Sequence, residues 1–329
     1  MSHLIETTWK GARAFALEND ALRVTVLPEH GARIASLVHR PTGREILWWP
    51  DDLDTLPAPT YAMSYADHPA VGVDECVPTI WADTFRGVSL PDHGEAWSLP
   101  WGVDATDEAI ETAVLLRRTP FALTRRLSLL DSAVRLDYLL TNTSEEPYPA
   151  LWALHPLMRW RPGTRVVLPP SVADVEIGSV GGQSPLPAYT AGASWPYVAA
   201  HPHNLDLAAA QLNADGAAAS TKLYAGPLAP DAGWAALHDA AGGFAVGFAF
   251  PTDVCTHLGL WLNRGDWGGY THVALEPATG PTEFLSGAAA RGAALTVPGD
   301  GSATWWVTLA VADGVASVGG VTESGTFLP

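Results

Sequence analysis

The sequence predicts an all-β protein, a large antiparallel β-sandwich, and three observations favour that class. Apolar and polar residues alternate with a period of two along many short segments, as in strands with one buried face. Convincing amphipathic helices are almost absent, and turns rich in Gly, Pro and Asn separate the segments. Neither an internal repeat nor a Pro/Ser linker divides the 329 residues. We therefore expect a single domain over residues 1–329.

The alternation is clearest in three places along the chain. Residues 22–26 alternate Leu, Val and Val with Arg and Thr, and a turn at 28–31 precedes a second strand at 34–38. Residues 134–140 and 303–309 show the same pattern. Further strands are expected at 110–118, 121–130, 148–154, 234–239, 244–250, 257–262 and 271–276.

One region departs from this pattern. Residues 170–232 are rich in Ala, Gly and Pro and poorly periodic, so we interpret them as long excursions from the sandwich. Within them, the Ala-rich stretch 205–220 favours a short helix, although Gly216 interrupts it. The His-Pro-His run at 201–203, followed by Asp206, lacks a third ligand at a recognisable spacing, so we interpret it as a surface loop and expect no metal site.

Composition excludes several classes of protein. A hydrophobic content of 47% with 16% charged residues is typical of a folded chain, and the net charge of −17 argues against a nucleic-acid partner. Cys76 and Cys255 form neither a disulfide framework nor a metal-ligand pattern. No apolar run approaches the roughly 18 residues of a membrane span. Residues 1–15 lack the features of a secretory signal, so we expect a cytoplasmic protein with no membrane partner.

The first candidate site segment is LPDHGEAWSLPW, residues 90–101. Its prolines and glycine prevent regular structure, so it is expected to be a loop that places His93 and the indoles of Trp97 and Trp101 in a cleft. Indole faces suit the apolar faces of sugar rings, although tryptophan also fills sandwich cores. The alternative is a capped turn with a hydrogen-bonded histidine.

The second segment joins a turn at 141–144 to an apolar strand that delivers His155 just before a proline. A histidine that closes an apolar strand is often a satisfied core residue. The proline favours a functional site, because it ends strand pairing and holds His155 at a rim.

The third segment is HVALEPATG, residues 272–280. Val273 and Leu275 alternate with small and polar residues, so Glu276 lies on the face opposite to them. A carboxylate at a strand end before a proline is positioned and partly desolvated, as a general base must be. An edge glutamate paired with an arginine is the alternative.

Together and in this order, these segments resemble the aldose 1-epimerase (galactose mutarotase) family and its hexose-phosphate epimerase relatives. Residues 22–28, 31–37 and 42–48 look like the opening hairpins of that family, and residues 73–80 with the LPDHGEAWSLPW loop look like a bacterial branch of it. The TNTS turn with the LHPL segment, and the LEPATG segment, resemble its later signatures. The resemblance covers nearly the whole chain except 170–232. It implies a galactose mutarotase-like supersandwich.

The resemblance also implies roles for three residues. Glu276 matches the general base that takes the anomeric proton, and His155 matches the general acid that protonates the ring oxygen. His93 matches the histidine that binds and polarises the sugar near that oxygen. Such chemistry needs no metal or organic cofactor. We expect the pair to be oppositely protonated, with an ionised Glu276 that helps to keep His155 charged.

The sequence departs from well-known galactose mutarotases ahead of the first histidine. Their Asn-Arg pair is not evident, and Asp74-Glu75 with a Cys-Val-Pro run stands in the corresponding region. Only Arg33 and Arg86 lie close to the key segments, so no arginine cluster for phosphate is evident. The substrate-binding candidates are Glu75, Asp74, Trp97, Trp101, Trp261 and Arg33.

We therefore predict an isomerase that interconverts the α and β anomers of a monosaccharide by acid/base ring opening. Three alternatives remain open: a hexose-phosphate epimerase, a non-catalytic carbohydrate-binding protein, and another sugar-active enzyme on the same scaffold. We make no prediction of the oligomeric state.

Overall fold

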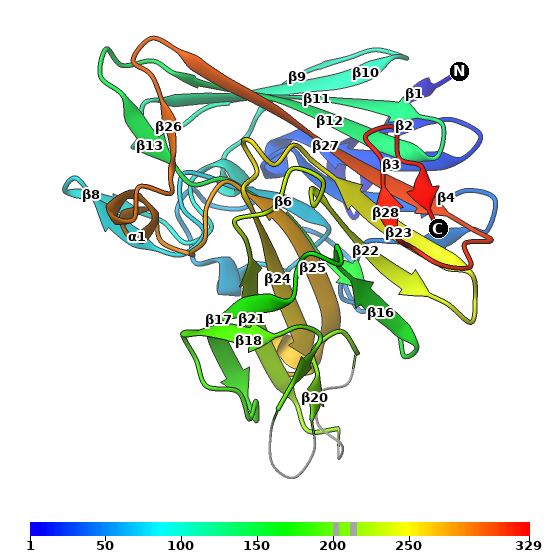
Figure 1. Ribbon diagram of the computed structural model, residues 1–329. Coiled ribbons are helices and arrows are strands. Elements are labelled where there is room, and N and C mark those ends of the chain that lie inside the picture. The colour runs from blue at the N-terminus through cyan, green and yellow to red at the C-terminus, as the bar shows by residue number, and fades with distance from the viewer. Residues whose placement is uncertain (200–203, 211–215) are drawn as a thin grey trace.

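A computed structural model describes residues 1–199, 204–210 and 216–329 of the chain. Within these residues the structure consists of two large antiparallel sheets and four small two-stranded ribbons. Figure 1 shows β9 to β12 and β27 crossing the upper part of the molecule, with β17, β21, β24 and β25 below them. The predicted all-β class is confirmed.

The larger sheet has 13 strands in the described part of the chain. Its strands follow the spatial order β1 (His3–Trp9), β2 (Ala12–Glu18), β3 (Leu22–Leu27), β4 (Arg33–His39), β6 (Val73–Cys76), β14 (Ala153–Pro156), β25 (Thr271–Ala278), β24 (His257–Arg264), β21 (Ala219–Ala225), β17 (Asp174–Gly182) and β18 (Thr190–Ser194), with β5 (Arg44–Glu45) beside β4 and β15 (Met158–Arg159) beside β25. Strands distant in sequence are thus neighbours at its centre.

The second sheet has eight strands and packs against the first. Its order is β16 (Thr164–Val167), β22 (Trp234–Asp239), β23 (Phe244–Ala249), β27 (Ser302–Ala312), β12 (Ala133–Asn142), β11 (Phe121–Leu130), β10 (Ala109–Leu115) and β9 (Gly102–Ala105). The small ribbons pair β7 (Asp83–Phe85) with β8 (Val88–Leu90), β13 (Tyr148–Ala150) with β26 (Leu295–Val297), β19 (Tyr197–Val198) with β20 (Leu205–Asp206), and β28 (Gly320–Val321) with β29 (Phe327–Leu328). A short α-helix, α1, spans Leu285–Ala290.

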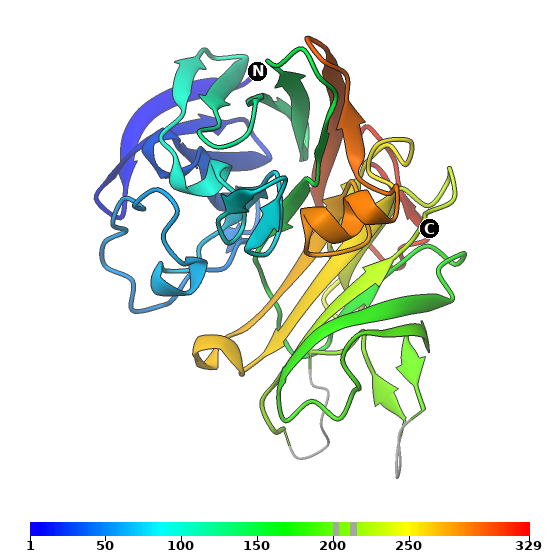
Figure 2. The same cartoon turned by 90° about the vertical axis from the view of Figure 1, so that its left-hand side faces the viewer.

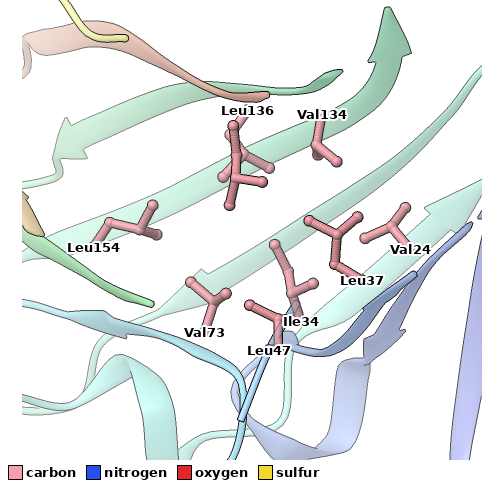
Figure 3. Close-up of a pocket in the computed structure, with 9 residues that line it drawn as sticks. Val24, Ile34, Leu37, Leu47, Val73, Val134, Leu136 and Leu154 are labelled. Atoms are coloured by element: carbon pink, nitrogen blue, oxygen red, sulfur yellow. The ribbon is translucent and has the colours of Figure 1, made fainter. Parts of the chain in front are cut away.

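The main core lies between the two sheets, where the apolar halves of the alternating strands meet. Figure 3 shows side chains from the first sheet, such as Val24 and Leu37, pointing towards Val134 and Leu136 of the second. The small hollow between them is lined only by aliphatic side chains, so it belongs to the core and offers nothing that would orient a polar ligand.

Most expected strands are present with bounds shifted by a few residues, but two expectations need correction. The strand expected at 148–154 is divided into β13 and β14, which pair with different partners. Residues 170–232 are not only excursions, because β17, β18 and β21 extend the larger sheet.

The described residues of 205–220 contain no helix, and residues 201–203 lie outside the described part. No helix among the described residues is long and apolar enough to cross a membrane.

Candidate functional site

A row of polar side chains crosses the face of the larger sheet that points away from the second sheet. Register places His155 opposite Asp74, Glu276 opposite Gly259, and Gly259 opposite Tyr224. Ion-pair distances link Arg33 to Asp74 and His155 to Glu276. The polar row therefore consists of Arg33 (β4), Asp74 (β6), His155 (β14), Glu276 (β25) and Tyr224 (β21), with Gly259 (β24) as its one gap.

The period of two explains why this row exists. The residues next to it, such as Val73, Leu154 and Leu275, point to the opposite face and join the core. Each strand thus supplies an apolar residue to the sandwich and a polar one to the row. In Figure 2, blue and cyan loops from the first hundred residues lie on one side of the yellow and gold strands β24 and β25.

Glu276 is fully buried and its two oxygens differ. Oε2 accepts a hydrogen bond from the Nζ atom of Lys222 on β21. Oε1 finds no hydrogen-bond partner among the described residues, and it lies 3.9 Å from Nε2 of His155. One oxygen is held by a cation, while the other faces a histidine.

His155 has only 7% of its side chain exposed. Burial lowers its pKa well below 6.5, and the neighbouring His93 and Lys222 lower it further. The ring is therefore neutral at neutral pH. This corrects the expectation that Glu276 keeps His155 charged, because Lys222 already compensates the carboxylate.

The loop at 90–101 brings His93 to the row through an unusual backbone. Gly94 has a φ of +71°, and a Cβ atom there would lie 2.1 Å from the carbonyl oxygen of Val77. Only glycine fits this close approach. The N–H of His93 donates to Ile80 O at 2.8 Å, which fixes the loop against β6 and its extension.

The His93 side chain is held on two sides. Its Nδ1 atom donates to Oδ1 of Asp92 at 3.0 Å, and its ring stacks on Tyr65 with centroids 3.8 Å apart. Burial acts to raise the pKa of Asp92, but the hydrogen bond and charge of His93, together with backbone hydrogen bonds from Tyr65 and His93, outweigh it and lower the pKa. With 19% of its side chain exposed, His93 is more open to solvent than His155, and the two ring centroids are 5.1 Å apart. The structure thus brings His93, His155 and Glu276 together.

Arg33 and Asp74 lie beneath this site. The Oη atom of Tyr65 donates to Oδ2 of Asp74, and Nε of Arg33 donates to Oδ1, both at 2.7 Å. Both Arg33 and Asp74 are buried, so they support Tyr65 under His93. Both oxygens of Asp74 already have donors, so Asp74 offers no free acceptor to a sugar.

Glu75 lies on the other side of the sheet, so its interpretation as a sugar ligand needs correction. Because neighbouring residues of a strand face opposite sides, Asp74 joins the row and Glu75 enters the core. There Glu75 accepts hydrogen bonds from Arg125 at 2.8 Å and from Tyr138 and Trp152 at 2.9 Å. Burial raises the pKa of Glu75, against the lowering effect of Arg125.

The predicted roles of two of the three tryptophans also need correction. Trp97 is fully buried under Tyr65, with its Nε1 donating to Asp92 O, and Trp101 is buried in the main core. Neither offers an exposed indole face. Their hydrogen bonds and packing anchor the loop that carries His93.

Trp261 is placed differently. It lies on β24 on the same face as Gly259, two residues along the strand, and it is partly exposed. Its Nε1 donates to Nε2 of His272 at 3.1 Å. Of the three indoles, this is the one that remains a candidate for stacking on a ligand.

Solved structures with a similar architecture are known. A galactose mutarotase related enzyme from Lactobacillus acidophilus matches with a TM-score of 0.64 at 16% identity, over 93% of this chain and 99% of that chain. A protein named "putative aldose 1-epimerase" from Klebsiella pneumoniae matches with a TM-score of 0.69 at 16% identity, over 95% and 83%. The chain has the galactose mutarotase-like fold. No family model and no curated protein sequence matches it.

Sequence reasoning missed Tyr65, Tyr224 and Lys222 of this site, and of these Lys222 hydrogen-bonds Glu276. In this galactose mutarotase-like fold, β21 places Lys222 beside Glu276, although β21 lies in the region expected to leave the sandwich. The available signal was weak, since the chain has only two lysines and one of them, Lys222, sits in an apolar and small-residue segment. Only the pairing of β21 with β24 reveals its role.

Proposed function

We propose that the chain is an aldose 1-epimerase that interconverts the α and β anomers of a monosaccharide, with Glu276 as base and His155 as acid. The observation that supports this most is the 3.9 Å separation of Glu276 Oε1 and His155 Nε2. Both atoms can then reach the anomeric hydroxyl and the ring oxygen of one hemiacetal, which are bonded to the same carbon.

The proton balance of ring opening suits these groups. Glu276 Oε1 takes the proton of the anomeric hydroxyl, the C1–ring oxygen bond breaks, and the protonated form of His155, which is the minor form at neutral pH, gives a proton to the ring oxygen. Rotation about C1–C2 and the reverse transfers close the ring on the other face. His93, held by Asp92 and Tyr65, is positioned to hydrogen-bond the sugar beside His155.

The charges of the site favour an unphosphorylated sugar. Arg33 is paired with Asp74, and Lys222 is paired with Glu276. Arg86 lies over the rings of Phe85 and Tyr148, outside the polar row. The arginine cluster that a hexose-phosphate epimerase would need is therefore not formed by these residues. In the described ranges, no three His, Cys, Asp or Glu side chains form a possible metal site.

The test is to measure anomer exchange by NMR on a panel of freshly dissolved neutral, acidic and phosphorylated sugars. An aldose 1-epimerase accelerates exchange of at least one of them above the spontaneous rate. A carbohydrate-binding protein shifts sugar signals without acceleration. Acceleration confined to phosphorylated sugars would contradict the proposed substrate class, and no acceleration on any sugar would contradict the proposed activity.

A further inference from the structure

Lys222 differs from the other lysine of the chain. Of the two lysines, Lys10 lies on the turn between β1 and β2, whereas Lys222 is buried in a strand whose residues are all buried. A buried ammonium is costly unless a charged partner compensates it. Its Nζ atom hydrogen-bonds Oε2 of Glu276.

The two charged residues are not on adjacent strands. β24 lies between β21 and β25, and the residue of β24 opposite Glu276 is Gly259. A Cβ atom on Gly259 would lie 3.1 Å from Glu276 Oε2 and 3.4 Å from Lys222 Nζ. The side chain of Lys222 therefore crosses β24 over a position where a side chain would crowd the ion pair.

The other groups that face Glu276 do not supply a cation. From the neighbouring elements these are His155, Cys76, Tyr224 and Glu283. Burial keeps His155 uncharged at neutral pH, and it raises the pKa of Cys76 and Tyr224 well above their usual values. Among the described residues, Lys222 is thus the cation in contact with the proposed base.

We infer that Lys222 is a positioning residue that keeps Glu276 ionised and holds Oε2, so that Oε1 alone faces the substrate, and that Gly259 is required because it leaves room for this pair. The inference rests on the proposed function of Glu276. In this arrangement Lys222 compensates the negative charge of Glu276, and His93 and His155 are left to act on the sugar.

The test compares Lys222→Met with the unaltered chain and with the control Lys10→Met. The carboxyl ¹³C signal of Glu276, assigned with Glu276→Gln, is followed over pH, and anomer exchange is measured on the same samples. Without the cation the protonated form of this fully buried carboxyl is favoured, so we expect the signal to titrate about three pH units higher in Lys222→Met. Exchange at pH 6–7 should fall about tenfold or more, and Lys10→Met should change neither readout.

Gly259→Ala provides a second variant that keeps both charges. The φ of Gly259 lies outside the left-handed region, so alanine adds no backbone strain and only a methyl group between the partners. We expect a shift of the Glu276 signal in the same direction and a smaller loss of exchange. This variant decides the question if Lys222→Met does not fold.

Two results would overturn the inference: an unchanged Glu276 titration in both variants, or a shifted titration with unchanged exchange at pH 6–7. Failure of the proposed function looks different. In that case the unaltered chain accelerates exchange on none of the sugars, while the titration shift still reports whether Lys222 compensates Glu276.

Discussion

Two buried carboxylates of this protein lie on opposite faces of the same sheet, and each has a basic partner. Glu75 lies between the sheets and accepts hydrogen bonds from Arg125, Tyr138 and Trp152, so both of its oxygens have donors. Glu276 lies on the outer face and has Lys222 on one oxygen, whereas its Oε1 finds no donor within the described ranges.

The difference separates a carboxylate that stabilises the fold from one that is available for chemistry. A fully hydrogen-bonded buried carboxylate has no free oxygen for a proton, and its loss leaves Arg125 buried without compensation. A carboxylate with one oxygen facing a histidine carries an unsatisfied group in the free protein that a bound hydroxyl would satisfy.

The largest effect is expected for Glu276→Gln. The amide keeps the size of the side chain but cannot accept the anomeric proton, so exchange should fall by about 10²–10⁴-fold. Because the amide no longer compensates the charge of Lys222, the variant should also melt at a lower temperature, so exchange is measured well below its melting temperature. The matched control is Glu45→Gln, a half-buried carboxylate of the larger sheet, whose pKa burial raises to about 7. Equal exchange in Glu276→Gln and Glu45→Gln would contradict the proposed base.

Glu75→Leu should act on the stability of the fold and not on the proposed proton transfer. Removing the carboxylate leaves the Arg125 guanidinium uncompensated in the core, which costs about 3–5 kcal/mol of unfolding free energy. Urea denaturation measures this loss. The control is the exposed pair of Glu6 and Arg13, where Glu6→Leu should cost no more than about 1 kcal/mol. Similar losses in the two variants would show that the buried pair contributes no special stability.

The pH dependence of kcat/KM tests His155. Its protonated form is the proposed acid and its pKa is lowered, so the active form becomes scarcer as pH rises. We expect kcat/KM to fall about tenfold per pH unit between pH 6.5 and 8.5, after subtraction of spontaneous exchange. His155→Gln should lose this dependence. A kcat/KM that is constant or rises over this range would rule out His155 as the acid.

The stability of the fold should also depend on pH through His272. Burial lowers its pKa from 6.5 to about 3, so below pH 6.5 the unfolded chain binds a proton that the folded chain does not. Above pH 6.5 this residue does not lower the free energy of unfolding. As pH falls below 6.5 it lowers that free energy, by about 2 kcal/mol at pH 5. The free energy of unfolding is measured by urea denaturation at pH 7.5 and at pH 5. Its decrease between the two pH values should be about 2 kcal/mol smaller in His272→Gln than in the unaltered chain. An unchanged difference would contradict the assignment.

The smallest effect is expected for Trp261→Phe. A smaller aromatic face without the donor to His272 should raise KM about two- to tenfold and leave kcat nearly unchanged. Trp101→Phe, a change within the core, should lower the melting temperature and leave KM unchanged. If Trp101→Phe raises KM as much as Trp261→Phe does, the partly exposed indole has no specific role at the site.

The same alternation that predicted the strands also explains what sequence reasoning missed. It placed Glu276 correctly on the face opposite to Val273 and Leu275, because that pattern is local. It did not separate Asp74 from Glu75, because a four-residue strand does not reveal which of its faces is buried. Nor did it find Lys222, whose partner is on a strand 54 residues away and is reached across a third strand.

The order of the polar row has a consequence for how the protein folds. Its members come from residue 33, residue 74, residue 155 and residue 276, and β14 must insert between β6 and β25 before the row is continuous. Local hairpins such as β11–β12 close short loops, whereas this insertion closes very long ones and adds the entropy cost of each. Chains dominated by such distant pairings fold slowly. The site is therefore expected to be among the last parts of the molecule to form, and a fragment that ends before β25 would keep hairpins and lack Glu276 altogether.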